Sequence, residues 1–187
     1  MAFAAIANDG LLMKPRILTS IEDPDGKVIQ NYPVESVRQV ISKEAALQVR
    51  STLEGVVSRG TGKKAAVPGF KAAGKTGTAQ KVLPNGTYSH DHFTASFVGF
   101  VPYDEPKLVI AVSLDEPHPV YYGGVVAAPA FAKVASGTLA YWQIAPAETP
   151  KEVTRVSPKT LKGKIRKEPS KIMPKPVDAA TMGLAGQ

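Results

Sequence analysis

Hydrophobic and polar positions along the middle of the chain follow the pattern of β-strands. Phe70 to Val82, Phe93 to Val101 and Leu108 to Leu114 are strand-like runs with turn residues between them. Pro84-Asn85-Gly86 is the strongest hairpin signal, because Asn-Gly suits a tight two-residue turn. Arg16 to Glu22 predicts one further strand nearer the N-terminus. The pattern therefore predicts three consecutive antiparallel strands joined by short loops.

Helical spacing is found on both sides of these strands. Ser42 fits an N-cap, and apolar residues at helical spacing follow it to a stop near Ser58-Arg59-Gly60. Ala127 to Trp142 predicts an apolar helix, and Met1 to Ala7 is typical of the end of a helix. We therefore expect an α+β fold in which helices cover an antiparallel sheet.

Composition divides the chain into two parts. The 187 residues are 43% hydrophobic and contain no cysteine, so the chain can bury one sizeable core and has no thiolate chemistry. No apolar run is expected to reach the roughly 18 residues of a membrane span. Residues 143–187 carry nine Lys or Arg against four Asp or Glu, and six of the 16 prolines. Residues 1–142 are thus expected to be ordered and residues 143–187 to form a disordered basic tail, which lacks the interleaved aromatic residues of a nucleic-acid binder.

The segment Gly74 to Gln80, Gly-Lys-Thr-Gly-Thr-Ala-Gln, carries the most informative chemistry of the chain. Because alternate side chains of a strand share a face, the Thr76 and Thr78 hydroxyls point the same way and can bind a carboxylate. Lys75 supplies positive charge for that carboxylate and can help to relay protons. Gly77 lets a substrate backbone lie close against the strand.

The same residues also satisfy a phosphate-loop pattern. Gly69 to Thr76 matches G-x-x-x-x-G-K-[ST], and Asp115-Glu116 ends an apolar strand, as the magnesium-binding carboxylate of a P-loop ATPase does. That mechanism requires a helix that begins at Lys75, so that its N-terminus faces the phosphates. A β-favouring stretch follows Lys75 instead. A P-loop NTPase is therefore an alternative function that the secondary structure of this segment can test.

Histidines offer little support for a metal site. His90 and His92 flank Asp91 in a predicted loop, whereas a metal site needs three or four converging ligands. We therefore expect these side chains to be solvated, and we expect neither a metal nor a cofactor.

A more specific resemblance is carried by four segments in order: Val57 to Gly62, Ala73 to Lys81, Ala95 to Pro102 and Tyr122 to Pro129. Lys-Thr-Gly is itself a signature of penicillin-binding proteins and β-lactamases. Together the segments resemble the C-terminal half of the transpeptidase domain of class B penicillin-binding proteins, the septal type above all. The likeness covers roughly Ala2 to Trp142.

The resemblance implies a peptidoglycan D,D-transpeptidase that cross-links the cell wall, takes part in cell division and is acylated by β-lactams. It implies that Thr76, Gly77 and Thr78 bind the D-Ala-D-Ala end of a stem peptide or a β-lactam. It also implies catalytic roles for Lys75 and Thr78, the Thr78 N–H being one of two oxyanion-hole donors. The implied partners are the N-terminal half of the same domain and the cell-wall synthesis machinery. The implied location is the bacterial cell envelope, at the outer face of the cytoplasmic membrane, with the membrane anchor outside this chain.

One departure from the family pattern limits the chemistry of this chain. No serine in it begins a Ser-x-x-Lys or Ser-x-Asn motif, so the nucleophile, its base lysine and the second motif are absent. We therefore expect a fragment that begins just after the second motif and is inactive alone. A non-catalytic envelope-binding module, which keeps the carboxylate site without the chemistry, is the other alternative.

Overall fold

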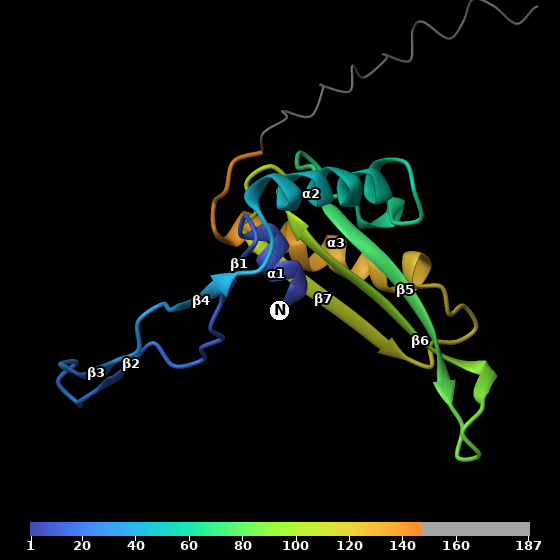
Figure 1. Ribbon diagram of the computed structural model, residues 1–187, viewed down its shortest axis with the longest axis horizontal. Helices are drawn as coiled ribbons and strands as arrows, with labels where there is room; N and C mark the ends of the chain where they lie inside the picture. Colours follow the sequence, from blue (N-terminus) through green and yellow to red (C-terminus); the bar gives the residue numbers. More distant parts are fainter. Residues whose placement is uncertain (147–187) are drawn as a thin grey trace, which may run out of the picture. The chain divides into compact units, whose positions relative to one another are not determined.

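The computed structural model describes residues 1–146 (Figure 1), and the predicted tail lies outside them from residue 147 onward. Its main sheet contains β5 (Ala73–Val82), β6 (Tyr88–Val101) and β7 (Leu108–Asp115), antiparallel and in that order. The Asn-Gly turn joins β5 to β6, with Gly86 at a φ of 81°. The prediction of three consecutive antiparallel strands is confirmed.

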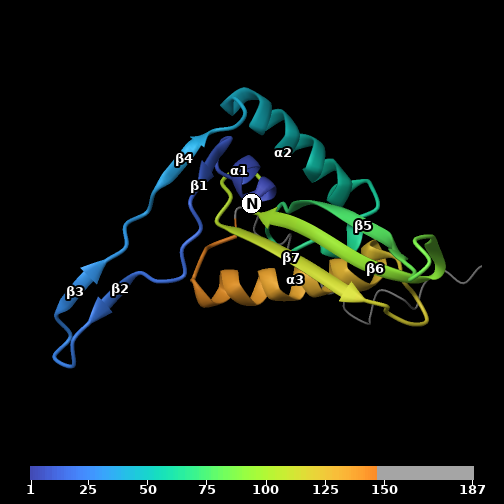
Figure 2. The same ribbon diagram turned by 60° about the horizontal axis from the view of Figure 1, so that its bottom comes forward.

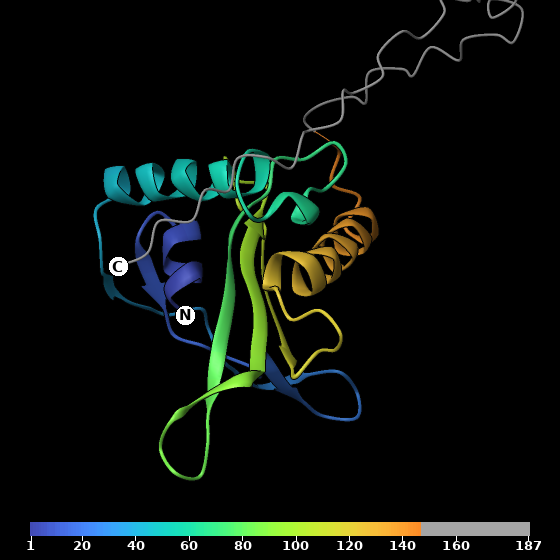
Figure 3. The same cartoon turned by 90° about the vertical axis from the view of Figure 1, so that its right-hand side faces the viewer.

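Helices cover both faces of this sheet. The helix α3 (Gly123–Tyr141) packs against one face, while α1 (Ala2–Ala7) and α2 (Lys43–Ser58) lie on the other (Figures 2 and 3). Between α3 and the sheet, the fully buried rings of Phe131 in α3 and Phe97 in β6 meet edge to face, with centroids 4.8 Å apart. This arrangement confirms the α+β fold.

Local chemistry explains where α2 begins but not where α3 does. The Ser42 hydroxyl accepts a hydrogen bond from the Ala45 N–H at 3.2 Å, which is the predicted N-cap. α3 begins at Gly123, four residues before the predicted start. Gly123 and Gly124 are poor helix formers, so the sequence pattern does not indicate that the helix begins there.

The helix α3 corrects the expectation that no segment is apolar enough to span a membrane. It is the one helix among residues 1–146 that is long and apolar enough to do so by length and composition. Its Ala127, Phe131, Ala135 and Leu139 are nevertheless buried against the sheet. The helix therefore serves as the core helix of this fold.

A two-stranded arm interrupts the chain between α1 and α2. The strand β1 (Leu11–Met13) pairs with β4 (Ser36–Gln39), and β2 (Ser20–Glu22) pairs with β3 (Val28–Asn31), all antiparallel. Among the described elements, β2 and β3 contact only each other, and the arm extends away from the helices (Figure 1). The predicted strand from residue 16 to 22 is correct only for its last three residues.

A buried arginine ties α1 to α2. The Arg50 side chain is only 4% exposed, and its guanidinium contacts the Asp9 carboxylate just beyond the end of α1. It also lies 3.4 Å from the Asp104 carbonyl oxygen. Asp9 has a φ of 53°, a left-handed conformation that aspartate tolerates better than most residues. This ion pair links the two helices that cover the same face of the sheet.

Candidate functional site

The strand β5 places the two motif threonines on one face at the edge of the sheet. Thr76 lies opposite Phe97, and Thr78 lies opposite Ala95, so both face the side on which α3 packs. Thr76 is half-buried and Thr78 is exposed. Among the described strands β5 pairs only with β6, which leaves its other edge open. The prediction that both threonines lie on one face of a strand is confirmed.

Two neighbours hold the Thr76 hydroxyl. The Thr61 and Thr76 hydroxyl oxygens lie 3.0 Å apart. The Lys75 ammonium donates to the Thr76 carbonyl oxygen at 2.9 Å and lies 3.5 Å from the Thr76 hydroxyl oxygen. Lys75 thus bends back over the strand and brings its charge to the threonine face.

The N-terminus of α3 holds the Thr78 hydroxyl. The Gly123 N–H donates to Thr78 Oγ1 at 3.2 Å. A Cβ on Gly123 would lie 2.3 Å from the Gly77 and Ser96 carbonyl oxygens, and a Cβ on Gly124 would lie 2.3 Å from the Thr61 carbonyl oxygen. Since only glycine permits so close an approach, the two glycines let the helix N-terminus reach the strand.

These parts border a cavity of about 520 Å³. Its lining consists of backbone and side-chain groups from the end of α2, the short helix η1 (Lys63–Ala65), β5 and the start of α3: Gly60, Thr61, Lys63, Lys64, Thr76, Thr78, Tyr122, Gly123, Gly124 and Val125. None of these lining residues is acidic. Two lysines, two motif hydroxyls and the positive end of a helix dipole therefore favour an anion here.

Gly123→Ala is expected to lower the free energy of unfolding by about 2 kcal/mol, because the new methyl group overlaps two backbone carbonyl oxygens that cannot rotate away. Urea denaturation of both proteins measures the difference. Gly137→Ala is the matched control in the same helix, since a Cβ there meets nothing within 4 Å. It should stabilise the chain by about 0.5–1 kcal/mol through helix propensity. Two variants of equal stability would show that α3 does not approach β5 so closely.

The phosphate-loop alternative is wrong. Lys75 and Thr76 lie inside β5, and the helix that a phosphate loop requires at this point is a strand instead. Asp115 and Glu116, the proposed magnesium-binding residues, lie at the far end of the antiparallel strand β7 and contact Lys81. The motif therefore cannot wrap a nucleotide phosphate in the way a phosphate loop does.

Sequence reasoning missed Thr61, Gly123 and Gly124 as parts of the site. Thr61 is 15 residues from Thr76, and Gly123 is 45 residues from Thr78, so no local periodicity connects them. The only available signal was their presence in the segments Val57 to Gly62 and Tyr122 to Pro129, which carried the family resemblance without assigning roles.

A second cluster of polar side chains lies around Glu116, at the other end of the sheet. Lys81 Nζ lies 2.8 Å from Glu116 Oε1, and His92 Nδ1 lies 3.1 Å from Glu116 Oε2. Lys81 also contacts Asp115 at 3.0 Å. We call Lys81, His92 and Glu116 the Glu116 cluster. His90 and His92 lie in β6 rather than in the predicted loop, because that strand begins at Tyr88.

The Glu116 cluster gives opposite pKa shifts to its carboxylate and ammonium groups. The hydrogen bond from Lys81, followed by that from His92, lowers the pKa of Glu116 below its ordinary 4.5. The hydrogen bond to Glu116, followed by that to Asp115, raises the pKa of Lys81 above its ordinary 10.5. The stabilisation from Glu116 is present above pH 4.5 and is lost as the pH falls through the lowered pKa. The stabilisation from Lys81 is present below pH 10.5 and is lost as the pH rises through the raised pKa.

The contribution of the Lys81–Glu116 ion pair to stability is therefore expected to be constant from about pH 5 to pH 10 and to decline outside that range. An NMR titration that follows the Glu116 side-chain carboxyl carbon tests the acid limb. Its midpoint should rise in Lys81→Met, because the main hydrogen-bond donor is lost. An unchanged midpoint would show that Lys81 does not bind Glu116 in solution.

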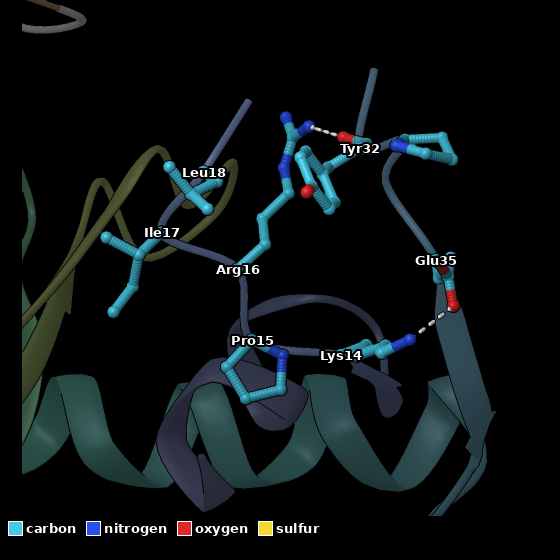
Figure 4. Close-up of a pocket in the computed structure, with 8 residues that line it drawn as sticks. Lys14, Pro15, Arg16, Ile17, Leu18, Tyr32 and Glu35 are labelled. Carbon is cyan, nitrogen blue, oxygen red and sulfur yellow. Dashed lines mark hydrogen bonds and ion pairs between the residues drawn. The ribbon is translucent and has the colours of Figure 1, made fainter. Parts of the chain in front are cut away.

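A cavity of about 340 Å³ in the arm is a weaker candidate (Figure 4). Lys14 forms an ion pair with Glu35 at 2.9 Å, and Arg16 donates a hydrogen bond to the Tyr32 carbonyl oxygen. Because Glu35 neutralises Lys14 and Arg16 already donates to a backbone carbonyl oxygen, both cations of this lining are engaged within the arm. The cavity beside β5 is thus the better candidate for a functional site.

Comparison with known proteins shows which family this chain resembles. The model of the family described as penicillin binding protein transpeptidase domain matches residues 1–136. Stage V sporulation protein D of Bacillus subtilis is 43% identical over 130 residues, which cover 68% of this chain and 20% of that protein. Penicillin-binding protein PbpB of Mycolicibacterium smegmatis is 42% identical over 147 residues, which cover 73% of this chain and 22% of that protein.

A solved structure shows the same similarity. Penicillin binding protein 3 from Mycobacterium tuberculosis, complexed with ampicillin, superposes with a TM-score of 0.71 and 36% identity, over 80% of this chain and 35% of that one. The chain thus spans about a fifth of the length of the curated relatives and about a third of the solved one. From the family match, the identities and the shared fold, it follows that this chain belongs to the transpeptidase-domain family of the class B penicillin-binding proteins.

Proposed function

We propose that this chain supplies the substrate-binding strand of an active-site serine D,D-transpeptidase that cross-links peptidoglycan and is acylated by β-lactams. The observation that carries the proposal is the pair of hydroxyls of Thr76 and Thr78, which lie on one face of β5 beside a cavity without acidic lining residues. Relatives named as probable peptidoglycan D,D-transpeptidases and a relative solved with ampicillin support it.

Thr76 and Thr78 are assigned to the substrate carboxylate. Thr78 Oγ1 already accepts a hydrogen bond from the Gly123 N–H, so its own O–H proton is free to donate. When Thr61 donates to Thr76, the Thr76 proton is free in the same way. Two hydroxyl donors can then bind the two oxygens of one carboxylate, with Gly77 between them to let the peptide approach.

Lys75 and the Thr78 backbone are assigned to the acyl-transfer step. The Lys75 ammonium, 2.9 Å from the Thr76 carbonyl oxygen, adds positive charge beside the carboxylate site and can help to relay a proton. The Thr78 N–H is assigned as one oxyanion-hole donor. The nucleophilic serine and its base lysine must come from another segment, for which the N-terminal half of the same domain is the proposed partner.

The cellular setting follows from the relatives, which are bacterial cell-wall synthesis proteins. We place the assembled protein in the cell envelope, at the outer face of the cytoplasmic membrane, because its substrate is peptidoglycan. A role in cell division, with the cell-wall synthesis machinery as partner, is part of the same proposal.

The test joins this chain to an upstream segment that supplies Ser-x-x-Lys and Ser-x-Asn motifs. Both the joined protein and the 187-residue chain are incubated with a fluorescent penicillin and separated by denaturing electrophoresis. The joined protein should become labelled, and the chain alone should not, because acylation needs a nucleophile that the chain lacks.

Two outcomes would contradict the proposal. A labelled band from the chain alone would mean that another residue is the nucleophile. A joined protein that binds the penicillin reversibly, at the cavity beside β5, but forms no covalent adduct would favour the non-catalytic envelope-binding module.

A further inference from the structure

The loop from Glu116 to Tyr122 borders the cavity at one end and the Glu116 cluster at the other. Its last residue, Tyr122, lines the cavity and precedes Gly123, the donor to Thr78. The loop connects the end of β7 to the start of α3, as the yellow segment in Figure 3 shows. The function proposed above uses neither Lys81, nor His92, nor Glu116.

Glu116 is fixed at three points, and these come from two strands. Its N–H donates to the Phe93 carbonyl oxygen of β6 at 3.0 Å. Its carboxylate binds Lys81 of β5 at 2.8 Å and His92 of β6 at 3.1 Å. Its φ of 45° is left-handed, a conformation that is unfavourable for glutamate and is held by these contacts.

The end of the loop, at Tyr121, also contacts Phe93 of β6. The Tyr121 ring stacks on the Phe93 ring, with centroids 4.1 Å apart and planes 8° from parallel. The Tyr121 and Tyr122 rings are 4.7 Å apart. Phe93 therefore binds the start of the loop through its carbonyl oxygen and the end through its ring.

We propose that Glu116 is a positioning residue, through which Lys81 and His92 set the place of Tyr122 at the rim of the substrate cavity. The Tyr122 side chain is exposed, so the course of the loop and the neighbouring Tyr121 ring determine where it lies. Loss of the Glu116 cluster frees the start of the loop and lets the rim move. This inference rests on the proposed function only for the identity of the ligand that binds in the cavity.

The expected effect falls on binding rather than on chemistry. Glu116 touches neither Thr76, nor Thr78, nor the cavity, so the acylation step itself should not depend on it. The pairs of the Glu116 cluster are partly exposed to solvent, and such pairs have modest energies. The dissociation constant of the complex that precedes acylation should therefore rise by about two- to fivefold.

The variants separate the side chain of Glu116 from its backbone conformation. Glu116→Gly removes the carboxylate but adopts a left-handed φ without strain. Lys81→Met removes the ammonium, and Lys81→Arg keeps a cation that can rescue the contact. Lys107→Met is the matched control, because it breaks another surface ion pair, with Glu105, outside the cavity lining.

Stopped-flow acylation of the joined protein by a β-lactam gives the dissociation constant and the acylation rate constant separately. Glu116→Gly and Lys81→Met should raise the dissociation constant and leave the acylation rate constant unchanged. Lys81→Arg should restore the dissociation constant, and Lys107→Met should change neither constant. Equal dissociation constants in all five proteins, or a fall in the acylation rate constant alone, would overturn the inference.

A second measurement does not require activity. In NMR spectra of the same protein, Glu116→Gly should shift the Tyr121 and Tyr122 ring resonances and the Gly123 amide, while Lys107→Met should not. If the wild-type protein is never acylated but these resonances move, the proposed function fails and the positioning role of Glu116 stands. If they do not move, the positioning role fails whether or not the protein is acylated.

Discussion

The double variant Thr76→Val, Thr78→Val in the joined protein is expected to be acylated about 10²- to 10³-fold more slowly than wild type. Valine keeps the shape of threonine but removes the hydroxyl that donates to the carboxylate. Hydrogen bonds to a charged group contribute about 1.5–3 kcal/mol each, and two bonds near the lower end of that range, about 3–4 kcal/mol together, account for a 10²- to 10³-fold change. The rate of labelling by a fluorescent penicillin measures the change.

The matched control for this result is the double variant Thr76→Ser, Thr78→Ser. It keeps both hydroxyls and loses only two methyl groups, so it should be acylated at a rate far nearer that of wild type. Thermal denaturation should show that the valine variant still folds, because β5 is an edge strand and valine suits a strand. Labelling of the valine variant at the normal rate would refute the role of this face of β5 in carboxylate binding.

Asp9→Asn is expected to lower the free energy of unfolding by about 3 kcal/mol. Asparagine tolerates the left-handed conformation of residue 9, so the variant removes the charge and leaves the backbone unstrained. The Arg50 guanidinium is then a buried cation without its carboxylate, and its Nε atom already has no hydrogen-bond partner among the described residues. The expected cost is at the lower end for a broken buried pair, because the Asp9 side chain is 42% exposed.

Urea denaturation measures this cost, and Lys43→Met is its matched control. Lys43 binds the same carboxylate at 3.0 Å, but its side chain is 63% exposed, so its loss should cost less than about 1 kcal/mol. Adding Arg50→Met to Asp9→Asn should recover part of the lost stability, since no buried charge remains. Equal costs for Asp9→Asn and Lys43→Met would show that the Arg50 ion pair does not hold α1 against α2.

The features that could be predicted from sequence are those determined by residues close together in the chain. The Ser42 cap, the Asn-Gly turn and the alternating threonines of β5 each depend on neighbours within a few residues. The segment from 11 to 39 was harder, because β1 pairs with β4 across a long interval and these short strands have no buried face to reveal them.

The candidate site was predictable only in part for the same reason. Its strand was identified from its own residues, and the partners that hold the two hydroxyls come from elsewhere in the fold. Gly123 would have been judged unfavourable for a helix, and only its close contact with β5 explains why it begins one. The Glu116 cluster could not be predicted, since it joins residues from two strands and a loop.

The open edge of β5 borders the proposed ligand site, but it also exposes the free protein to aggregation. Unpaired N–H and C=O groups on an edge strand can pair with a strand of another molecule, which is a common start of aggregation. A positively charged side chain on such an edge opposes this, and β5 carries Lys75 near its start, whereas Asp115 and Glu116 neutralise Lys81 near its end. The Lys75 ammonium can therefore discourage a second copy from pairing with this edge while it attracts a small anionic ligand.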